Sequence, residues 1–269
     1  MYKVGDLVTR NSYSNDIVFK IIKVEEDIYY LKGISIRLYA DSKEEDLKKY
    51  EEEVSKEDEK ELLSRIKKDF KMERNDFFYL PGKILHIDGD SEYLEECLNY
   101  YKKVGLLAIG KVVKEDEIQN HIEEWIEEYM PSIVVITGHD AYYSKKGDKF
   151  DANNYKNSLN FIKAVKKARD IEKSHDKLII IAGACQSDYE ELIKAGANFA
   201  SSPKRINIHA LDPAVIASYM ALYDSSKDID IIKVLENTKY GANGMAKIGY
   251  NYVDILMHYY PGTVLKNTY

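Results

Sequence analysis

The sequence has little of what membrane, secreted or disulfide-bonded proteins require. Its 269 residues include only two cysteines, Cys97 and Cys185, so we expect no disulfide framework and a reducing compartment. No apolar run approaches the roughly 18 residues that a bilayer-spanning helix needs. Residues 1–6 also lack the apolar stretch of a signal peptide. These absences predict a cytoplasmic protein with no membrane partner.

The sequence also has no excess of basic residues and no residues at the spacing typical of metal ligands. The net charge is -7, whereas a nucleic-acid-binding protein normally carries a basic stripe, so we expect no nucleic-acid partner. His, Cys, Asp and Glu do not recur at the spacing of metal ligands, and we expect neither a metal nor another cofactor. The chain is 45% hydrophobic and 32% charged, which suits a full core under a polar surface. The oligomeric state stays open.

Residues 1–42 are rich in short segments of β type. Runs of β-branched and aromatic residues occur at 4–10, 17–22, 28–31 and 34–38. A cluster of turn-forming residues at 11–16 separates the first two runs. We therefore expect a small SH3-like β-barrel at 1–42, a fold that usually binds or packs.

A segment dense in Glu and Lys follows at residues 43–78. Its second half carries Leu62, Ile66 and Phe70 at four-residue spacing, which predicts an amphipathic helix with one apolar stripe. Its first half has too little apolar surface to pack well. We interpret 43–78 as a charged helical linker between the barrel and a domain at 79–269.

Residues 79–269 alternate between apolar runs and amphipathic segments. The apolar runs lie at 83–88, 104–113, 133–136 and 178–181, and predicted helices at 91–103, 115–130, 156–169 and 187–195. Continuous apolar runs are typical of strands that are buried on both faces of a parallel sheet. Their alternation with helices predicts right-handed crossovers, and hence an α/β domain with a mainly parallel sheet.

Two loops stand out because each follows one of the most apolar strands. The run at 133–136 leads into Thr-Gly-His-Asp, which contains His139, and the run at 178–181 leads into Ala-Gly-Ala-Cys, which ends at Cys185. In an open parallel sheet, ligands bind outside the carboxyl ends of the strands, and neighbouring strands lie about 4.8 Å apart. If the crossover helix at 156–169 joins neighbouring strands, the two side chains can meet.

A cysteine and a histidine placed in this way have the chemistry of a nucleophile and its base. A thiol with the ordinary pKa of about 8.5 is mostly protonated at neutral pH, and the thiolate is the reactive form. An adjacent imidazole takes the proton and stabilises the anion. A helix beginning near Ser187 would favour negative charge close to Cys185. Backbone N–H groups near Gly138 and Cys185 are candidates for binding an oxyanion.

From the pattern alone, these residues could also have structural, non-catalytic roles. A single cysteine after a strand is more often a small buried residue than a nucleophile, and a single histidine there is usually a polar loop residue. Cys97 lies mid-helix and His175 precedes a strand, so we expect both to be structural. His209 follows another short apolar run, and we keep it as a candidate supporting residue at the same sheet edge.

The histidine and the cysteine after these two strands make the chain resemble a known family. An apolar strand ending in a histidine, followed about 46 residues later by an apolar strand ending in Ala-Cys, resembles the His/Cys dyad of caspase-like (clan CD) peptidases. The segments 136–140 and 182–192 resemble more specifically the YabG-type sporulation proteases, as do 4–10 and 195–203. The resemblance covers essentially the whole chain, the barrel included.

The resemblance implies a caspase-like three-layer α/β domain and a cysteine endopeptidase with His139 and Cys185 as its dyad. It also implies protein substrates from the spore coat and germination apparatus. The implied location is the mother cell of a sporulating bacterium or its spore coat. Caspase-like enzymes usually have glycine after the histidine, whereas Asp140 follows here. The N–H of Asp140 could serve the oxyanion, and its carboxylate could orient the histidine or, like Asp188, contact a basic substrate side chain.

Two other classes of function fit parts of the sequence. A non-enzymatic regulator with a receiver-like or cofactor-binding α/β domain is suggested by residues 192–198, which are similar to the late helix–strand turn of such domains. A Cys-dependent amidase or acyltransferase would use the same dyad. The glycine-rich segment 241–245 follows no strong strand, so we expect a flexible loop there rather than a phosphate-binding one.

Overall fold

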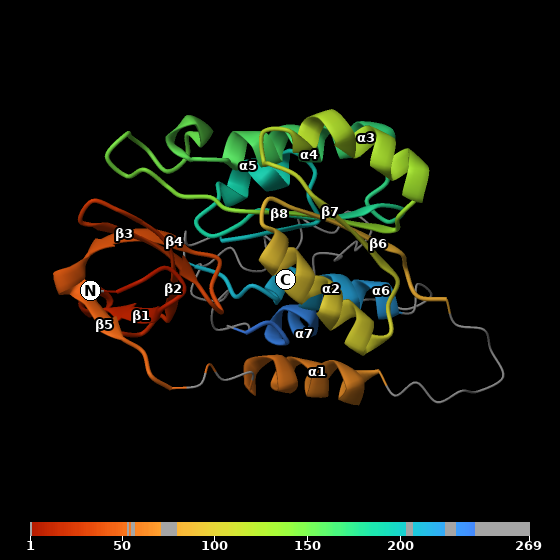
Figure 1. Ribbon diagram of the computed structural model, residues 1–269. Coiled ribbons are helices and arrows are strands. Elements are labelled where there is room, and N and C mark those ends of the chain that lie inside the picture. The colour runs from red at the N-terminus through yellow and green to blue at the C-terminus, as the bar shows by residue number, and fades with distance from the viewer. Residues whose placement is uncertain are drawn as a thin grey trace, which may run out of the picture. The chain divides into compact units, whose positions relative to one another are not determined.

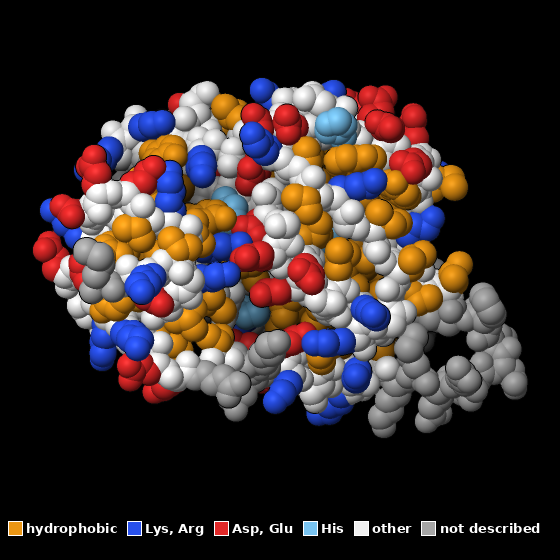
Figure 2. All heavy atoms as spheres, in the orientation of Figure 1, with side chains coloured by type: hydrophobic (Ala, Val, Ile, Leu, Met, Phe, Trp, Pro, Cys, Tyr) orange, Lys and Arg blue, Asp and Glu red, His pale blue; other side chains and the backbone are white. Residues whose placement is uncertain are grey.

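The computed structural model describes residues 2–52, 54, 57–70, 80–202, 207–223 and 230–239, and the segment 241–245 lies outside them. The chain forms two compact units, Met1–Lys56 and Glu57–Tyr269 (Figure 1). Within the described ranges, every helix is too short or too polar to span a bilayer. The face in Figure 2 carries acidic and basic side chains intermingled, without a broad area of one sign.

The first unit is a five-stranded antiparallel sheet in the order β4-β3-β2-β1-β5. Its strands are β1 (Leu7–Arg10), β2 (Phe19–Glu25), β3 (Ile28–Gly33), β4 (Tyr39–Lys43) and β5 (Leu47–Lys49). Its core consists of Val8, Phe19, Ile21, Tyr29, Leu31 and Leu47. Alternate strand residues reach this core because successive side chains of a strand point to opposite faces. The expected β-rich unit is present, and its assignment as an SH3-like barrel stays a prediction.

The first unit runs past the predicted end at residue 42. The chain turns after β4 and returns as β5, which pairs with β1. Asp46 fastens this return, because its carboxylate accepts hydrogen bonds from Arg10 Nε (2.9 Å), Ser12 N (2.8 Å) and Ser12 Oγ (2.7 Å). The bond from the Ser12 hydroxyl and then the Arg10 guanidinium lower the pKa of Asp46 to about 2.

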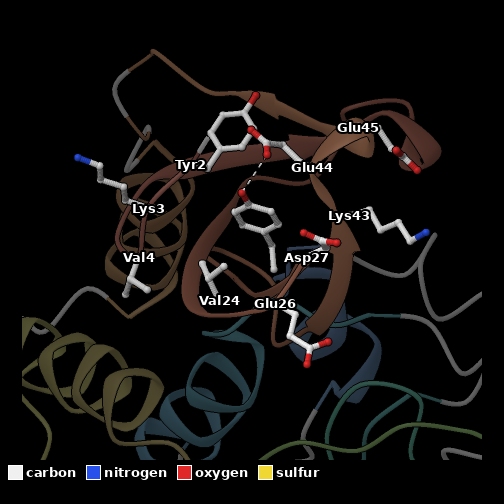
Figure 3. A pocket seen from close by; sticks show the side chains of 10 residues that line it. Tyr2, Lys3, Val4, Val24, Glu26, Asp27, Lys43, Glu44 and Glu45 are labelled. Carbon is white, nitrogen blue, oxygen red and sulfur yellow. Dashed lines mark hydrogen bonds between the residues drawn. The ribbon is translucent and has the colours of Figure 1, made fainter.

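A pocket in the first unit lies beside Tyr29, whose hydroxyl donates to Glu44 Oε2 at 3.2 Å (Figure 3). Its lining consists of Tyr2, Lys3, Val4, Val24, Glu26, Asp27, Tyr29, Lys43, Glu44 and Glu45. Carboxylates therefore outnumber ammonium groups around its rim.

The charged segment ends in a helix that belongs to the second unit. Helix α1 spans Glu57–Asp69. Leu62 and Ile66 are buried in the core of that unit, and the ring of Phe70 packs edge-on against Tyr219 with centroids 5.3 Å apart. The four-residue spacing thus predicted the helix, while its few apolar residues are enough to attach it to the second unit instead of leaving a free linker.

The second unit contains a five-stranded parallel sheet in the order β10-β9-β8-β6-β7. The strands are β6 (Ile84–Asp88), β7 (Ala108–Val112), β8 (Ile133–Thr137), β9 (Ile179–Ala182) and β10 (Phe199–Ala200). The remaining helices are α2 (Ser91–Val104), α3 (Ile118–Tyr129), α4 (Ser158–Ile171), α5 (Tyr189–Lys194), α6 (Asp212–Leu222) and α7 (Ile231–Glu236). The predicted parallel α/β architecture is confirmed, and its caspase-like character stays a prediction.

Helices cover both faces of this sheet (Figure 1). Ile133 and Val135 of β8 belong to one core together with residues of α1, α2, α6 and α7. Val134 and Ile136 belong to a second core together with residues of α3, α4 and α5. The strand is therefore buried on both sides, which is why it is apolar throughout and shows no alternation.

The strand order reverses at β6. From β6 the chain crosses to β7 on one side, then passes back over β6 to β8 on the other side. Such a switch point leaves a crevice outside the carboxyl ends of the two strands, and ligands of open α/β sheets bind there. In this sheet the switch point lies beyond Asp88 of β6 and Thr137 of β8, which pair in register.

Asp46 makes the first unit sensitive to acid. Its folded pKa of about 2 lies below the ordinary value of about 3.9, so its stabilisation is present above pH 4 and is lost as the pH falls toward 2. We expect Asp46→Asn to lower the stability of this unit at pH 7 and to flatten its loss between pH 4 and 2. Thermal unfolding of the full chain followed by near-ultraviolet circular dichroism measures this.

The control is Asp16→Asn, which removes an exposed carboxylate from the same unit and should leave the pH dependence unchanged. An Asp46→Asn variant whose acid sensitivity equals that of the wild type would show that this ion pair contributes nothing.

Candidate active site

The two predicted loops lie at the same edge of the sheet. Strands β8 and β9 are neighbours, with Ile136 paired to Ala182, and the N–H of Gly183 donates to the carbonyl of Ile136 at 3.0 Å. His139 lies three residues after Ile136, and Cys185 lies three residues after Ala182, each just beyond the carboxyl end of its strand. The two strands are therefore adjacent and parallel, as expected, and their loops emerge side by side.

The imidazole of His139 is held by a carboxylate. His139 Nε2 lies 3.0 Å from Asp90 Oδ2, and both side chains are largely buried. The main chain of His139 is fixed as well, since its N–H donates to Glu115 Oε1 (2.8 Å) and its carbonyl accepts from Asn157 Nδ2 (2.8 Å). The ring of Tyr93 lies against the imidazole, with centroids 5.6 Å apart.

Asp90 is a functional candidate that the sequence reasoning missed. Asp90 is the N-cap of α2, and its Oδ1 accepts from the N–H groups of Glu92 (2.9 Å) and Tyr93 (3.2 Å). Ser91 is the first helical residue. The available signal was an Asp that directly precedes a helix, two residues after a buried strand.

A buried polar cluster links the ends of β6 and β8 beneath this pair. His86 contacts the Tyr101 hydroxyl through Nδ1 (3.0 Å) and the Thr137 hydroxyl through Nε2 (2.9 Å). The Thr137 hydroxyl donates to Asp88 Oδ2 (2.7 Å), and Asp88 Oδ1 accepts from the N–H of Asp90 (2.9 Å). The backbone of Asp90 is thus fixed to both strands at the switch point.

Two glycines make room for Glu115 at the same edge. A Cβ on Gly89 or Gly138 would lie 2.4 Å or 2.5 Å from Glu115 Oε1, so a side chain at either position would displace the Glu115 carboxylate. Backbone N–H groups near Gly138 are among the oxyanion donors expected from the sequence. The structure adds that the missing side chain of Gly138 admits the carboxylate that binds the N–H of His139.

The carboxylate of Asp140 faces the interior and joins the His139 loop to α4. It accepts hydrogen bonds from the N–H of Asn157 (2.7 Å), the hydroxyl of Ser158 (2.5 Å) and the N–H of Ala141 (2.9 Å). The Ser158 oxygen in turn accepts from the N–H of Asp188 at 2.7 Å. Burial raises the pKa of Asp140, and these hydrogen bonds oppose the rise.

The loop that carries Cys185 is tight. Gly183 has a φ of 103° and Gln186 a φ of 59°, a left-handed conformation that is uncommon for a residue with a side chain. The N–H of Ala184 donates to the Ser187 hydroxyl oxygen at 2.9 Å. The Cys185 side chain is buried, and its Sγ accepts from the N–H of Ile208 at 3.2 Å.

Gln186 joins the two loops directly, because its side-chain oxygen accepts from the N–H of Tyr142 at 3.2 Å. The helix expected from Ser187 begins at Tyr189 instead. Ser187 takes part in the turn, and Asp188 is the N-cap, with Oδ1 accepting from the N–H of Glu191 at 3.3 Å. Asp188 is fully buried.

His209 is also buried, next to the residue that contacts the sulfur. Its Nδ1 accepts from the N–H of Leu211 (3.1 Å), and its Nε2 lies 3.8 Å from Asp58 Oδ2 on α1. Its imidazole thus lies against α1 and the start of α6. Asp212, the first helical residue of α6, accepts a hydrogen bond from the N–H of His209 at 3.0 Å.

The residues expected to be structural lie elsewhere. Cys97 is fully buried in α2, where its Sγ contacts the carbonyl of Ala210 at 3.5 Å. His175 precedes β9, at the amino end of the strands, and its carbonyl accepts from Asn198 Nδ2 at 3.1 Å. Among the described residues, no group of His, Cys, Asp and Glu side chains could hold a metal ion.

Comparison with known proteins identifies the family. The family model described as YabG peptidase U57 matches residues 3–251. The chain belongs to this family. It is 40% identical over 278 residues to the sporulation-specific protease YabG of Bacillus subtilis (strain 168), an alignment that covers 92% of the chain and 94% of the relative. No solved structure matches. The predicted resemblance to YabG-type sporulation proteases is confirmed, and the chain is a peptidase by family.

The interior contacts of Asp140 predict a large cost for its removal from this YabG-family chain. Asp140→Ala leaves the buried donors of Asn157 and Ser158 without their acceptor, and we expect a loss of about 2–4 kcal/mol in the free energy of unfolding. Asp140→Asn keeps one acceptor oxygen and should cost less. Urea unfolding followed by the fluorescence of Trp125, the single tryptophan, reports on the second unit.

The raised pKa of Asp140 also predicts how its contribution to stability changes with pH. The folded protein binds the Asp140 proton more tightly than the unfolded chain, so this group's contribution to stability falls as the pH rises above about 4. That decline should be absent in Asp140→Asn. Asp148→Ala, at an exposed position of the same loop, should change stability by less than about 0.5 kcal/mol. Equal effects of Asp140→Ala and Asp148→Ala would contradict the account.

Proposed function

We propose that this peptidase is a cysteine endopeptidase with a caspase-like catalytic domain, in which Cys185 is the nucleophile and His139 the general base and acid. The observation that supports it most is the position of the two residues at equivalent points beyond adjacent parallel strands, β8 and β9. The carboxyl edge of the sheet is where ligands of such folds bind. No cofactor enters the proposal.

The proposed reaction proceeds through an acyl-enzyme. His139 takes the thiol proton, and the Cys185 thiolate attacks the scissile carbonyl carbon to form a C–S bond. When the C–N bond breaks, the proton passes from His139 to the leaving amine. Water then gives a proton to His139 and attacks the thioester, which releases the acid and returns the proton to the sulfur.

The N–H of Asp140 is the proposed oxyanion donor on the His139 loop. Among the described residues none accepts a hydrogen bond from it, whereas the N–H of His139 is bound by Glu115. Backbone N–H groups of the Cys185 loop complete the proposed oxyanion site. Because the carboxylates of Asp140 and Asp188 are buried and bind the protein's own N–H groups, we do not propose them as contacts for a basic substrate residue. His209 would act only through its neighbour Ile208.

Access to the sulfur requires a local change. Only 1% of Cys185 is exposed, and Ile208 donates its N–H to the sulfur. A substrate carbonyl must replace this contact before attack, so substrate binding must shift Ile208 away from Cys185. The left-handed Gln186 and the glycine at position 183 allow the nucleophile loop to adopt a sharp turn at this point.

The proposed substrates are spore coat and germination proteins, and the proposed location is the mother cell of a sporulating bacterium or its spore coat. Both follow from the likeness to a sporulation-specific protease. Membership of a peptidase family argues against a non-enzymatic regulator. An amidase or acyltransferase would use the same two residues, and no contact in the site favours either.

Cleavage of recombinant spore coat proteins tests the proposal. Cys185→Ser and His139→Ala should each lower the cleavage rate by roughly 10³-fold or more, because the nucleophile and its base act as a unit. Cys97→Ser, which changes the other buried cysteine, should keep wild-type cleavage. Fragments are quantified by mass spectrometry with mapping of the new termini. Cleavage by Cys185→Ser at the wild-type rate would refute a cysteine mechanism.

A further inference from the structure

We propose that Asp90 is the positioning residue of the catalytic histidine, and that it holds the His139 proton on Nε2 so that Nδ1 accepts the thiol proton of Cys185. This inference rests on the proposed cysteine peptidase mechanism and adds a third residue to it. The direct observation is the 3.0 Å contact between Asp90 Oδ2 and His139 Nε2.

The contact is shielded from solvent. The side chains of His139 and Asp90 are 10% and 6% exposed, so water competes little for this hydrogen bond and its electrostatic strength is greater than at the surface. The ring of Tyr93 covers one side of the imidazole. The pair also lies at the switch point where the strand order reverses between β6 and β8, the place where such sheets bind ligands.

Asp90 cannot turn away from His139 without breaking other bonds. Its Oδ1 caps α2 by accepting from Glu92 and Tyr93, and its N–H is bound to Asp88. The amino end of a 14-residue helix also attracts negative charge. Oδ1 thus serves the helix, and Oδ2 is left in a fixed direction for the imidazole.

The hydrogen bond determines the tautomer of His139. An ionised carboxylate only accepts hydrogen bonds, so Nε2 must carry the proton and donate it to Asp90. A neutral imidazole has a single N–H, and Nδ1 therefore presents the lone pair that a general base needs. When Nδ1 takes the thiol proton, the positive charge of the imidazolium lies next to Asp90, which favours the thiolate–imidazolium pair.

Several charged and titratable groups lie around His139. Asp90 and Tyr93 of α2 contact the imidazole, and Glu115, which precedes α3, binds the backbone N–H of His139. Asp88 and His86 of β6 reach the site through the N–H of Asp90. The carboxylate of Glu115 thus binds the main chain of His139, whereas the carboxylate of Asp90 contacts its imidazole.

Asp90→Asn is the decisive variant, because Asn caps helices as well as Asp. Its oxygen can still serve α2, but its NH2 group would face Nε2 and force that nitrogen to accept, which moves the His139 proton to Nδ1. We expect kcat to fall roughly 10²- to 10⁴-fold with KM changed less than about threefold. The pH at which Cys185 alkylation by iodoacetamide is half-maximal should rise, while Asp148→Asn, at an exposed position of the His139 loop, should leave this pH unchanged.

The tautomer can be measured without any substrate. In ¹⁵N-histidine-labelled wild-type protein, assigned with His139→Ala, the proton of neutral His139 should be on Nε2, and in Asp90→Asn it should be on Nδ1. A wild-type proton on Nδ1 overturns the inference, even if the Asn variant fails to fold. Unchanged turnover and pH profile in Asp90→Asn, with Cys185→Ser inactive, also overturn it while the cysteine mechanism stands. Full activity of Cys185→Ser would refute both the cysteine mechanism and the role of Asp90.

Discussion

The pairing of β8 with β6 on one side and β9 on the other is the constraint on which the site depends. It brings Asp90, His139 and Cys185 to one edge of the sheet, although they are far apart in the sequence. A slip of one residue would turn every side chain of β8 to the opposite face. Because β8 is apolar on both faces, the polar residue at its end marks the register: the Thr137 hydroxyl donates to Asp88 of β6 at 2.7 Å.

The carboxyl edge of the sheet is built from buried polar groups, and burying such groups destabilises the fold unless they are hydrogen-bonded. Asp140 binds the start of α4, Asp90 caps α2, and Asp88 accepts from Thr137 and the backbone of Asp90. The bonds of Asp140 and Asp90 join loops of the site to helices, and the bond between Thr137 and Asp88 joins β8 to β6. The site is therefore held by rigid elements, as preorganised catalysis requires.

Much of the fold could be predicted from the sequence because its strands are continuous apolar runs and its helices have clear stripes. The positions of His139 and Cys185 after adjacent strands could be predicted as well, and their catalytic roles stay a proposal. Asp90 could not, since its partner lies 49 residues away and Ser91 is also a good capping residue. The start of α5 was misplaced because Ser187 binds Ala184 in the turn, which leaves the cap to Asp188.

The most direct test of the central claim is covalent capture of the nucleophile. The full-length protein is treated with a peptide that carries a thiol-reactive ketone, and the adduct is located by intact-mass and peptide-mapping mass spectrometry. The account predicts one equivalent of label on Cys185 and none on Cys97, with labelling lost in His139→Ala. Label on Cys97, or labelling of Cys185 that is equally fast without His139, would contradict a catalytic pair at the carboxyl edge of the sheet.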